Sequence, residues 1–334
     1  MLIQHTSRGL YCPAGDFYID PWLPVPRAVI THAHGDHARF GCDSYLCAAP
    51  GVEPLSLRVE GIIQLIGYGE QISINGVRVS LHPAGHVLGS AQVRVEVKGE
   101  VWVVSGDYKR EPDPTCAPFE VVSCHTFITE STFGLPVYRW PAGERVITQI
   151  YEWWSENAAA GRPSVLLSYV MGKSQRILAM LGEYDELPGP VYAHGALQQM
   201  NEAYRRAGIA LMDAPNPVSV ANNTDVFTTA LVLAPPSAQS SSWLKRFKGC
   251  AVGRVSGWMR IRGRRRRLAL DKGFVMSDHA DWPALLTTIS ETGAERVIAT
   301  HGNGSALTRF LVEQGVCAEA WTDKEWPEGE EQVQ

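Results

Sequence analysis

The stretch Thr31-His32-Ala33-His34-Gly35-Asp36-His37 places three imidazoles and a carboxylate in its last six residues, directly after the apolar run Ala28–Ile30. Imidazole nitrogens and carboxylate oxygens bind zinc and similar divalent ions at about 2.0 to 2.2 Å. The first two histidines, two residues apart, project to one side, whereas the final Asp36-His37 pair lies on the next turn of chain. The stretch therefore predicts a metal site that serves two neighbouring ions. A surface loop with incidental histidines is the alternative, and the density of ligand-type side chains argues against it.

Length and composition are those of a globular protein. The 334 residues are 45% hydrophobic and 19% charged, enough for one large or two medium domains. The start, Met1 to Leu10, does not have a signal-peptide pattern, and no later run approaches the roughly 18 apolar residues of a membrane span. The 7 cysteines are odd in number and include no C-x-x-C, so reduced thiols are expected. We expect a soluble, cytoplasmic protein.

The charge distribution is uneven although the formal net charge is only -5. No acidic residue occurs between Asp225 and Asp271, and this interval holds ten of the 30 lysines and arginines, including the run Arg264, Arg265, Arg266 and Arg267. Such a concentration indicates a nucleic-acid contact, with a solvated basic face as the alternative. If the arginine run is extended, its side chains alternate between two faces, and two or three of them can meet one phosphate track.

Short apolar runs repeatedly end at an ionisable side chain, as in sheets that gather a site at one edge. The runs and the residues that follow them are Phe17–Ile19 with Asp20, Ala28–Ile30 with His32, Val77–Leu81 leading to His86, Val101–Val104 with Asp107, Phe127–Thr129 with Glu130, Phe274–Met276 leading to His279, and Arg296–Thr300 with His301. Between the last of these strands we expect a helix from the N-cap Asp281 to Gly293 and another over Gly304–Gln314.

The middle of the chain has strand-helix units of its own. Arg145–Ala160 reads as a helix, Val165–Leu167 as a buried strand, and Arg176–Leu181 as the next helix. The fold class is therefore α/β, with an inserted domain over residues 137–274 and a first domain made of 1–136 and 275–334. The tail from Asp323 to Gln334 is rich in acids and is expected to be mobile.

The segment Met171–Gln175 follows a predicted strand and contains Gly172-Lys173-Ser174. It is not a Walker loop, because the position five residues before Gly172 is Leu167 rather than glycine. A helix N-terminus with a nearby lysine can still bind a phosphate. Lys173 and Ser174 are therefore candidate nucleic-acid contacts, and ordinary strand-to-helix packing is the equal alternative.

The motif H-x-H-x-D-H, present as His32 to His37, resembles the signature of the metallo-β-lactamase fold superfamily. That resemblance implies an αββα sandwich in which His32, His34 and His86 bind one metal while Asp36, His37 and His301 bind the other. It further implies that Asp107 bridges the two ions and that Asp20 orients a ligand loop. We expect two divalent metal ions per chain, either zinc or manganese. Asp36 and Asp20 are also candidate catalytic residues.

Four further motifs resemble the β-CASP nucleases across nearly the whole chain: Thr129–Gly134, Ser168–Gln175, Phe274–Asp281 and Thr300–Gly302. The resemblance implies that Glu130 and His279 form a pair whose imidazole contacts the scissile phosphate and acts in proton transfer. The most similar subgroup is the bacterial DNA-ligase-associated exonucleases, on the motifs Arg8–Cys12, Ile19–Trp22, Ser256–Met259 and Asp271–Phe274.

The subgroup implies a single-strand DNA exonuclease, with the 5′ end favoured, that acts in DNA repair with an ATP-dependent DNA ligase. The insert is shorter than in the RNA-processing members of the family, which favours DNA over a long RNA as the substrate. His301 is a difference from Artemis-type DNA enzymes, which usually lack a histidine at that position. An RNA-processing β-CASP ribonuclease is the principal alternative. A small-molecule hydrolase could use the same metal centre, but it has no need of an insert that carries ten basic residues.

Overall fold

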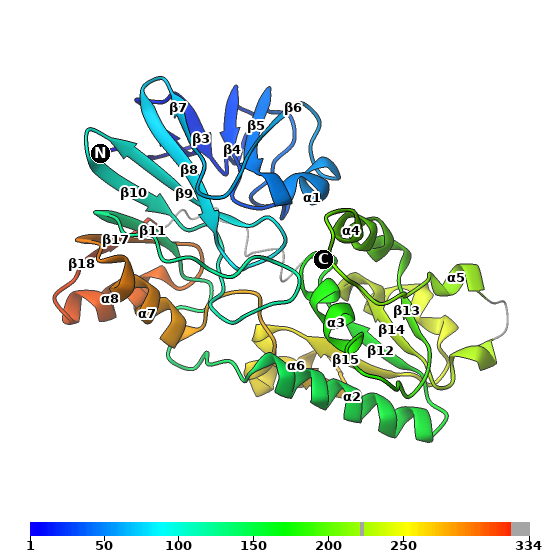
Figure 1. Ribbon diagram of the computed structural model, residues 1–334. Helices are drawn as coiled ribbons and strands as arrows, with labels where there is room; N and C mark the ends of the chain where they lie inside the picture. The colour runs from blue at the N-terminus through cyan, green and yellow to red at the C-terminus, as the bar shows by residue number, and fades with distance from the viewer. Residues whose placement is uncertain (221–223, 322–334) are drawn as a thin grey trace. The chain divides into compact units, whose positions relative to one another are not determined.

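The computed structural model describes residues 1–220 and 224–321 and divides the chain into two compact units (Figure 1). The first unit contains Met1–Arg139 and the described residues from His279 onward, and the inserted unit contains Trp140–Asp278. The sequence had placed the two junctions after residues 136 and 274. Each unit has its own core.

The first unit contains two sheets. The six-stranded sheet has its strands in chain order: β1 (Gln4–Thr6), β2 (Gly9–Cys12), β3 (Phe17–Ile19), β4 (Arg27–Val29), β5 (Ser44–Ala48) and β6 (Ile62–Ile66). The seven-stranded sheet has the order β18 (Cys317–Ala320), β17 (Arg296–Thr300), β11 (Thr126–Glu130), β10 (Glu100–Val104), β9 (Ala91–Val97), β8 (Val77–Pro83) and β7 (Gln71–Ile74). Its pairs are parallel from β10 to β18 and antiparallel from β7 to β10. After β5, η1 (Ala49–Gly51) and α1 (Val52–Ser56) precede β6.

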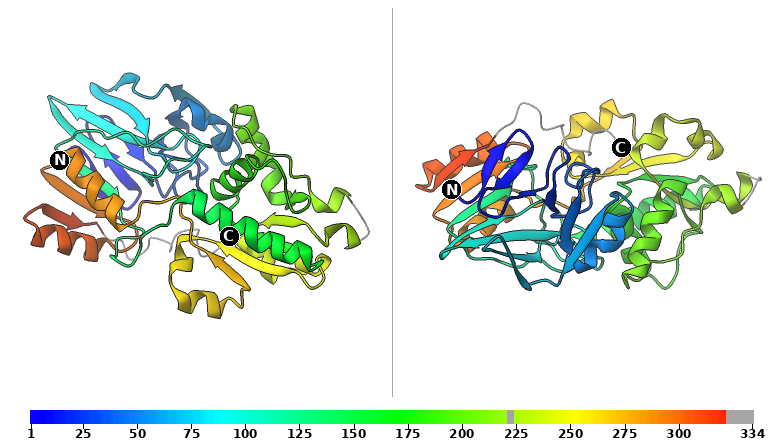
Figure 2. Two further views of the ribbon diagram at one scale, coloured as in Figure 1. Left: turned by 60° about the horizontal axis from the view of Figure 1, so that its bottom comes forward. Right: turned by 90° about the horizontal axis from the view of Figure 1, so that it is seen from above.

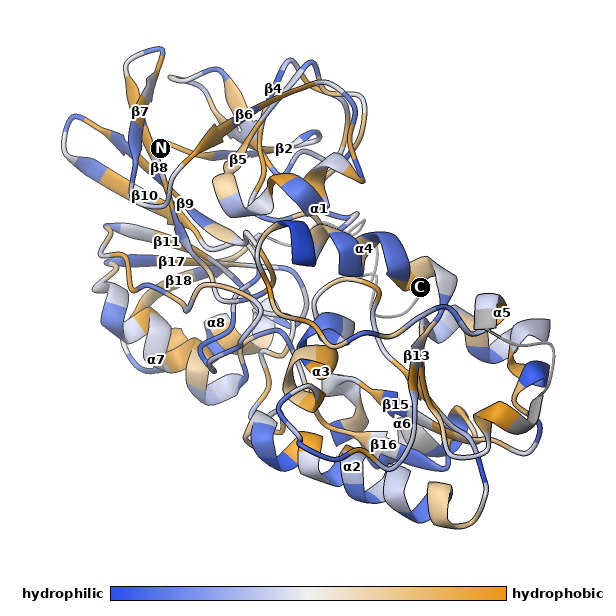
Figure 3. Ribbon diagram, turned by 45° about the vertical axis from the view of Figure 1, so that its right-hand side comes forward, coloured by the Kyte–Doolittle hydropathy of each residue, from blue (hydrophilic) through white to orange (hydrophobic). Residues whose placement is uncertain are grey.

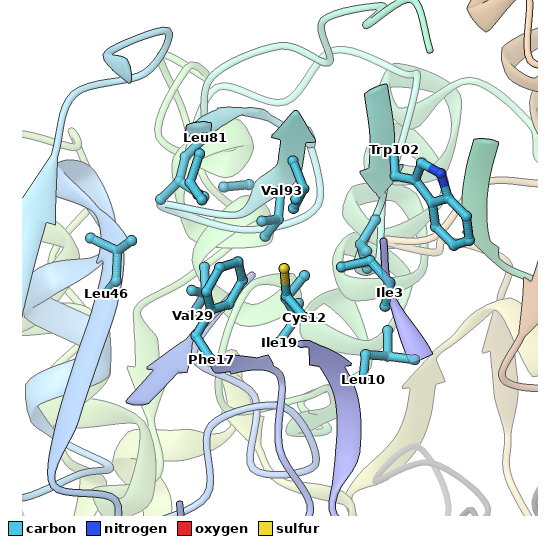
Figure 4. Packing of buried hydrophobic residues seen from close by; sticks show 14 of the residues in the cluster. Ile3, Leu10, Cys12, Phe17, Ile19, Val29, Leu46, Leu81, Val93 and Trp102 are labelled. Atoms are coloured by element: carbon cyan, nitrogen blue, oxygen red, sulfur yellow. The ribbon is translucent and has the colours of Figure 1, made fainter. Parts of the chain in front are cut away.

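The two sheets face each other across a core built by strand alternation. Figure 4 shows Phe17, Ile19 and Val29 from the six-stranded sheet directed toward Leu81 and Val93 from the other. Because successive side chains of a strand point to opposite faces, the strands β10, β11, β17 and β18 also present apolar residues to the other face of the seven-stranded sheet. That second face is the one that the helices of this unit cover.

Helices α7 (Trp282–Thr292) and α8 (Gly304–Glu313) pack on this second face, against the side chains of Val103 and Val297 among others. Figure 2 shows both helices, in orange to red, beside β17 and β18. The sequence prediction for α7 is confirmed, because the Asp281 carboxylate accepts a hydrogen bond from Ala284 N at 3.0 Å and the helix ends at Gly293 with a left-handed φ of 65°. The α/β sandwich predicted from the sequence is the fold observed.

The inserted unit is a parallel five-stranded sheet covered on both faces. Its strand order is β13 (Val191–Ala193), β14 (Leu231–Ala234), β12 (Ser164–Leu167), β15 (Ala251–Val255) and β16 (Lys272–Phe274). One face packs against α2 (Gly143–Ala159), α3 (Lys173–Leu181) and α4 (Gly195–Arg206), and Figure 3 shows polar and apolar segments alternating along α2. The short elements are α5 (Pro217–Val220), α6 (Arg262–Arg267), η2 (Thr224–Phe227), η3 (Pro236–Ser240), η4 (Ser242–Arg246) and η5 (Gly257–Arg260).

Three local predictions are wrong in detail. The strand expected over Phe274–Met276 is β16, which ends at Phe274 and belongs to the sheet of the inserted unit, because the Phe274 ring packs there against Trp153 at 5.5 Å. Helix α3 begins at Lys173, three residues before the predicted start. The arginine run is helical in α6 rather than extended. Within the described parts of the chain, no helix is long and apolar enough to cross a membrane.

Candidate metal centre

The ligand candidates of the first unit lie in loops that follow strand ends. The loop His32–His37 follows β4, and the other candidates follow or end five further strands: Asp20 after β3, His86 after β8, Asp107 after β10, Glu130 at the end of β11 and His301 after β17. Glycine allows the loops to approach closely. A Cβ at Gly106, whose φ is +55°, would lie 2.6 Å from Thr31 Cβ. The sheet edge therefore brings together residues that are up to about 280 positions apart in sequence.

Four of these side chains converge on one point. Ligand atoms of His32, His34, His86 and Asp107 all lie within 4.8 Å of one another. The His34 Nδ1 atom is 3.0 Å from His32 Nε2 and 3.1 Å from His86 Nε2. Asp107 Oδ2 is 3.5 Å from His32 Nε2 and 3.8 Å from His86 Nε2. Tetrahedral zinc ligands at their usual bond lengths are about 3.3 Å apart, so the donor set fits a zinc-like ion.

A second set of ligand candidates also lies near Asp107. His37 Nε2 is 3.3 Å from Asp107 Oδ2 and 3.6 Å from Asp36 Oδ2, and the rings of His37 and His301 stack with centroids 5.1 Å apart. His301 has a positive φ of 52°, and the next residue, Gly302, has no room for a Cβ, which would lie 2.5 Å from Ser131 O. A non-glycine residue held in this conformation within a ligand cluster indicates a functional constraint on the backbone. Asp107 thus lies between the two groups, where a bridging ligand would be.

Asp20 orients the ligand loop rather than joining the cluster. Its carboxylate accepts hydrogen bonds from Thr31 N at 2.8 Å and Thr31 Oγ1 at 2.6 Å, and it contacts His37 Nδ1 at 2.7 Å. Thr31 Oγ1 is also 3.0 Å from His32 Nδ1. Each of these two histidines therefore has one ring nitrogen fixed by a polar neighbour, so the other is directed at Asp107.

Glu130 and His279 form a buried pair beside the metal ligands. His279 Nδ1 lies 2.9 Å from Glu130 Oε2 and 3.9 Å from Asp107 Oδ2. The other Glu130 oxygen accepts a hydrogen bond from the backbone N–H of Tyr108 at 2.7 Å. The aromatic ring of Phe133 approaches the imidazole edge-on, with centroids 5.9 Å apart. The carboxylate thus holds the imidazole in one orientation, close to the candidate metal ligands.

Burial and neighbouring charges set the protonation of these groups in opposite directions. Burial lowers the pKa of His32 well below its ordinary value, with further lowering by His37. Burial also lowers the pKa of His37, but the carboxylates, Asp107 first, outweigh it and raise that pKa well above the ordinary value. For Asp107, burial raises the pKa and the neighbouring histidines lower it well below the usual range. Burial raises the pKa of Glu130 and lowers that of His301 to about 4. Burial and the mutual charges of these neighbours thus shift the pKa values of all five groups away from their ordinary values.

Sequence reasoning missed two contributors to this centre. Thr31, which bonds both Asp20 and His32, stands in the stretch that predicted the site, and its position directly before the first histidine was the available signal. Tyr108 contributes a backbone N–H to Glu130, and no side-chain pattern in a sequence indicates such a contact.

The nucleic-acid candidates of the inserted unit have different surroundings. Lys173 is 1% exposed, and its ammonium lies 3.2 Å from Asp278 Oδ2 and 4.5 Å from the centre of the Tyr169 ring. Ser174 is fully buried and bonds Ser168 Oγ at 2.7 Å. These contacts correspond to the packing alternative rather than to an open phosphate site. Of the arginine run, Arg266 and Arg267 are exposed, and the side chains of Arg264 and Arg265 lie outside the described residues.

Comparison with known proteins gives relatives and a shared fold, although no protein-family model matches the chain. The chain is 31% identical over 323 residues to a probable DNA ligase of Opitutus terrae, an alignment that covers 94% of this chain and 30% of that protein. It is 33% identical over 135 residues to endoribonuclease YSH1 of Saccharomyces cerevisiae, with 38% and 17% covered. The chain thus spans less than a third of either relative.

Among solved structures, a protein of unknown function from Enterococcus faecalis V583 matches with a TM-score of 0.59 at 11% identity. The match covers 91% of this chain and 80% of that one. At this identity the likeness concerns the fold alone.

Proposed function

We propose that this chain, which belongs to the β-CASP nuclease family of the metallo-β-lactamase fold, is a metal-dependent enzyme that hydrolyses DNA phosphodiester bonds. The observation that carries the proposal is the convergence of two groups of side chains at strand ends of both sheets of the first unit. The ligand cluster of His32, His34, His86 and Asp107 lies directly beside the Glu130–His279 pair. Hydrolysis of a phosphodiester uses both groups. Metal ions held by the first would activate the attacking water, and the imidazole of the second can give a proton to the leaving oxygen.

The donor set fits two divalent ions, which we propose to be zinc or manganese. His32, His34 and His86 would hold one ion, Asp36, His37 and His301 the other, and Asp107 would contact both. When bound, such ions lower the pKa of a coordinated water and stabilise negative charge on phosphate oxygens. Imidazole-rich sites suit zinc, whereas carboxylates admit manganese, so the mixture of ligands is compatible with either.

The residues of the chain supply positioning and proton transfer. Asp20 fixes the orientation of His37 through a 2.7 Å contact, and Thr31 does the same for His32. Glu130 holds the His279 imidazole, whose second ring nitrogen is then available to donate a proton to a phosphate oxygen or to the leaving oxygen. A carboxylate partner favours the charged imidazole, which is the form that can donate.

DNA is favoured as the substrate by the similarity to a probable DNA ligase, whose alignment covers nearly the whole chain. Trimming of a single strand prepares ends that a ligase can join, so we propose a single-strand DNA exonuclease that acts in DNA repair with an ATP-dependent ligase. Attack from the 5′ end rests on the family resemblance alone.

RNA is the second candidate substrate, and the similarity to an endoribonuclease is the observation that favours it. The metal centre itself does not distinguish the two sugars. A small-molecule hydrolase has less support, because the basic run from Lys245 to Arg267 has no role in such an enzyme.

One assay separates these functions. Metal-loaded protein is incubated with single-stranded DNA and RNA of the same sequence, each labelled at either the 5′ or the 3′ end, and with a thioester. The proposal expects DNA to be degraded fastest, with the 5′ label released first as a mononucleotide or short product. Faster cleavage of RNA than of DNA would identify RNA as the substrate. Hydrolysis of the thioester alone would overturn the nuclease assignment.

A further inference from the structure

A buried ion pair lies directly behind the metal ligands of the first unit and has no role in the function proposed above. Lys109 Nζ and Asp113 Oδ2 are 2.5 Å apart, and their side chains are 1% and 3% exposed. Both residues belong to the segment that follows Asp107. Burying two opposite charges carries a large desolvation penalty, so such a pair is weak evidence of a gain in stability. The pair therefore points to a role in fixing the local geometry, and the surrounding contacts indicate which residues are fixed.

Two ligand loops must meet although their strands are not neighbours. His86 follows β8 and Asp107 follows β10, and β9 lies between these strands in the sheet. Strands two places apart are separated by about 9.5 Å. The ligand atoms nevertheless approach to 3.8 Å, from His86 Nε2 to Asp107 Oδ2. Something must therefore hold one loop over the other.

The segment around the ion pair provides this hold through the backbone of the His86 loop. Lys109 N donates to Ala84 O at 3.0 Å, and a Cβ at Gly85 would lie only 2.3 Å from Lys109 O. Further along, the Cys116 thiol contacts Gly85 O at 3.4 Å, and Glu120 N donates to Pro83 O at 3.1 Å. The chain after Asp107 thus lies along residues 83–85, which precede the ligand His86.

Asp113 closes this segment into a rigid turn. Its Oδ1 atom accepts hydrogen bonds from Thr115 N at 2.8 Å and Thr115 Oγ1 at 2.6 Å, while Oδ2 accepts from Lys109. Pro112 and Pro114 flank it, and each fixes a backbone φ angle. The single carboxylate therefore ties Lys109, whose backbone touches the His86 loop, to Thr115 on the far side of the turn.

We propose that the Lys109–Asp113 pair positions the metal centre by setting the separation of Asp107 and His86, and thereby sets the affinity for the ion that these residues share. Lys109 and Asp113 are positioning residues, since neither is among the candidate ligands. The inference rests on the metal centre of the proposed function.

The test uses the full chain with Lys109→Met and Asp113→Asn combined, because these changes remove both buried charges while the side-chain amide oxygen at position 113 can still accept the hydrogen bonds from Thr115. Unfolding of the metal-free protein is measured first. Affinity for Zn²⁺ alone and Mn²⁺ alone is then measured by competition with a chromophoric chelator, well below the unfolding temperature. We expect a metal-free unfolding temperature close to that of the wild type and a metal affinity about 10- to 100-fold weaker.

The matched control removes the exposed pair formed by the next residue, Arg110→Met with Glu291→Leu, and should leave metal affinity unchanged. Should the double variant fail to fold, Thr115→Val removes one hydrogen bond to Asp113 and should weaken affinity by roughly 2- to 10-fold. Metal affinity equal to that of the wild type in a folded variant overturns the inference alone. A wild-type protein that binds neither ion overturns the proposed function as well.

Discussion

Two loops in this molecule both place polar side chains directly after a buried strand, but these side chains have different surroundings. The loop His32–His37 follows the buried strand β4, and the loop that leads into Lys173 follows the buried strand β12. Both concentrate polar side chains next to a glycine; the sequence predicts a metal site in the first, whereas in the second a phosphate contact and ordinary packing are equal alternatives. In the first, imidazole nitrogens from separate loops converge on a carboxylate within 4.8 Å.

In the second loop, each polar side chain bonds a group of its own unit. Lys173 pairs with Asp278, Ser174 bonds Ser168, and Gln175 donates to Asn201 Oδ1 at 2.7 Å. The difference teaches that residue type and spacing indicate which chemistry is available, whereas the partners supplied by distant parts of the chain decide whether it is used. Each prediction below tests one side of this contrast.

The largest effect is expected at the residue between the two ligand groups. Asp107→Ala removes the carboxylate that lies 3.3 Å from His37 Nε2 and 3.5 Å from His32 Nε2. We expect loss of at least one bound ion and a fall in turnover of more than about 10³-fold, because activation of water depends on the metals. Metal analysis and a DNA cleavage assay on the same preparation check this. Retention of both ions with normal turnover would contradict the assignment.

Replacing the imidazole of the buried pair should affect catalysis without affecting the metals. His279→Ala removes the group held by Glu130 at 2.9 Å, and turnover should fall by about 10² to 10⁴, the usual range for a positioned acid or base. Metal content should stay at the wild-type value. A fall in metal content instead would identify His279 as a ligand.

The contrast is tested from the other side at Lys173. Lys173→Met removes the cation 3.2 Å from the buried carboxylate of Asp278 and leaves Arg176 4.0 Å from it, so the free energy of unfolding should fall by about 1.5 to 3 kcal/mol. The dependence of DNA affinity on salt should stay the same. Unchanged stability with a salt slope reduced by about 0.7, the value for one phosphate contact on a single strand, would restore the phosphate-binding hypothesis.

The smallest effect on turnover is expected for the arginine run. In the helix α6, consecutive side chains point in directions about 100° apart, so about one or two of the four arginines can face one phosphate track. Replacing Arg264 to Arg267 by glutamine should therefore reduce the slope of log affinity against log salt by roughly 0.7 to 1.4, less than an extended run would give. Binding titrations at several salt concentrations measure it, with cleavage at saturating DNA as the control. An unchanged slope would indicate a solvated face or a protein-docking surface.

The parts of the fold that depend on local rules were predictable from the sequence. The helix between Asp281 and Gly293 is an example, because a carboxylate N-cap and a left-handed C-terminal glycine act within a few residues. The stretch His32–His37 could be identified as a candidate ligand loop for a similar reason, since its ligand types and spacing are contained in six residues.

Features set by distant partners were not predictable. From the sequence, the apolar run at Phe274 could belong to either unit. Its packing against Trp153, more than a hundred residues earlier, places Phe274 in the inserted unit. Asp278, the partner of Lys173, is similarly distant in sequence. The backbone N–H of Tyr108 that fixes Glu130 has no signature in the side chains at all.

The measurement that tests the central claim most directly is metal content and DNA cleavage on one preparation, before chelation, after chelation and after metal is restored. The account predicts about two zinc or manganese ions per chain, cleavage of single-stranded DNA that stops when the ions are removed, and recovery when they are returned. Cleavage that continues at full rate in the chelated protein, or a purified protein that takes up no divalent ion, would contradict it.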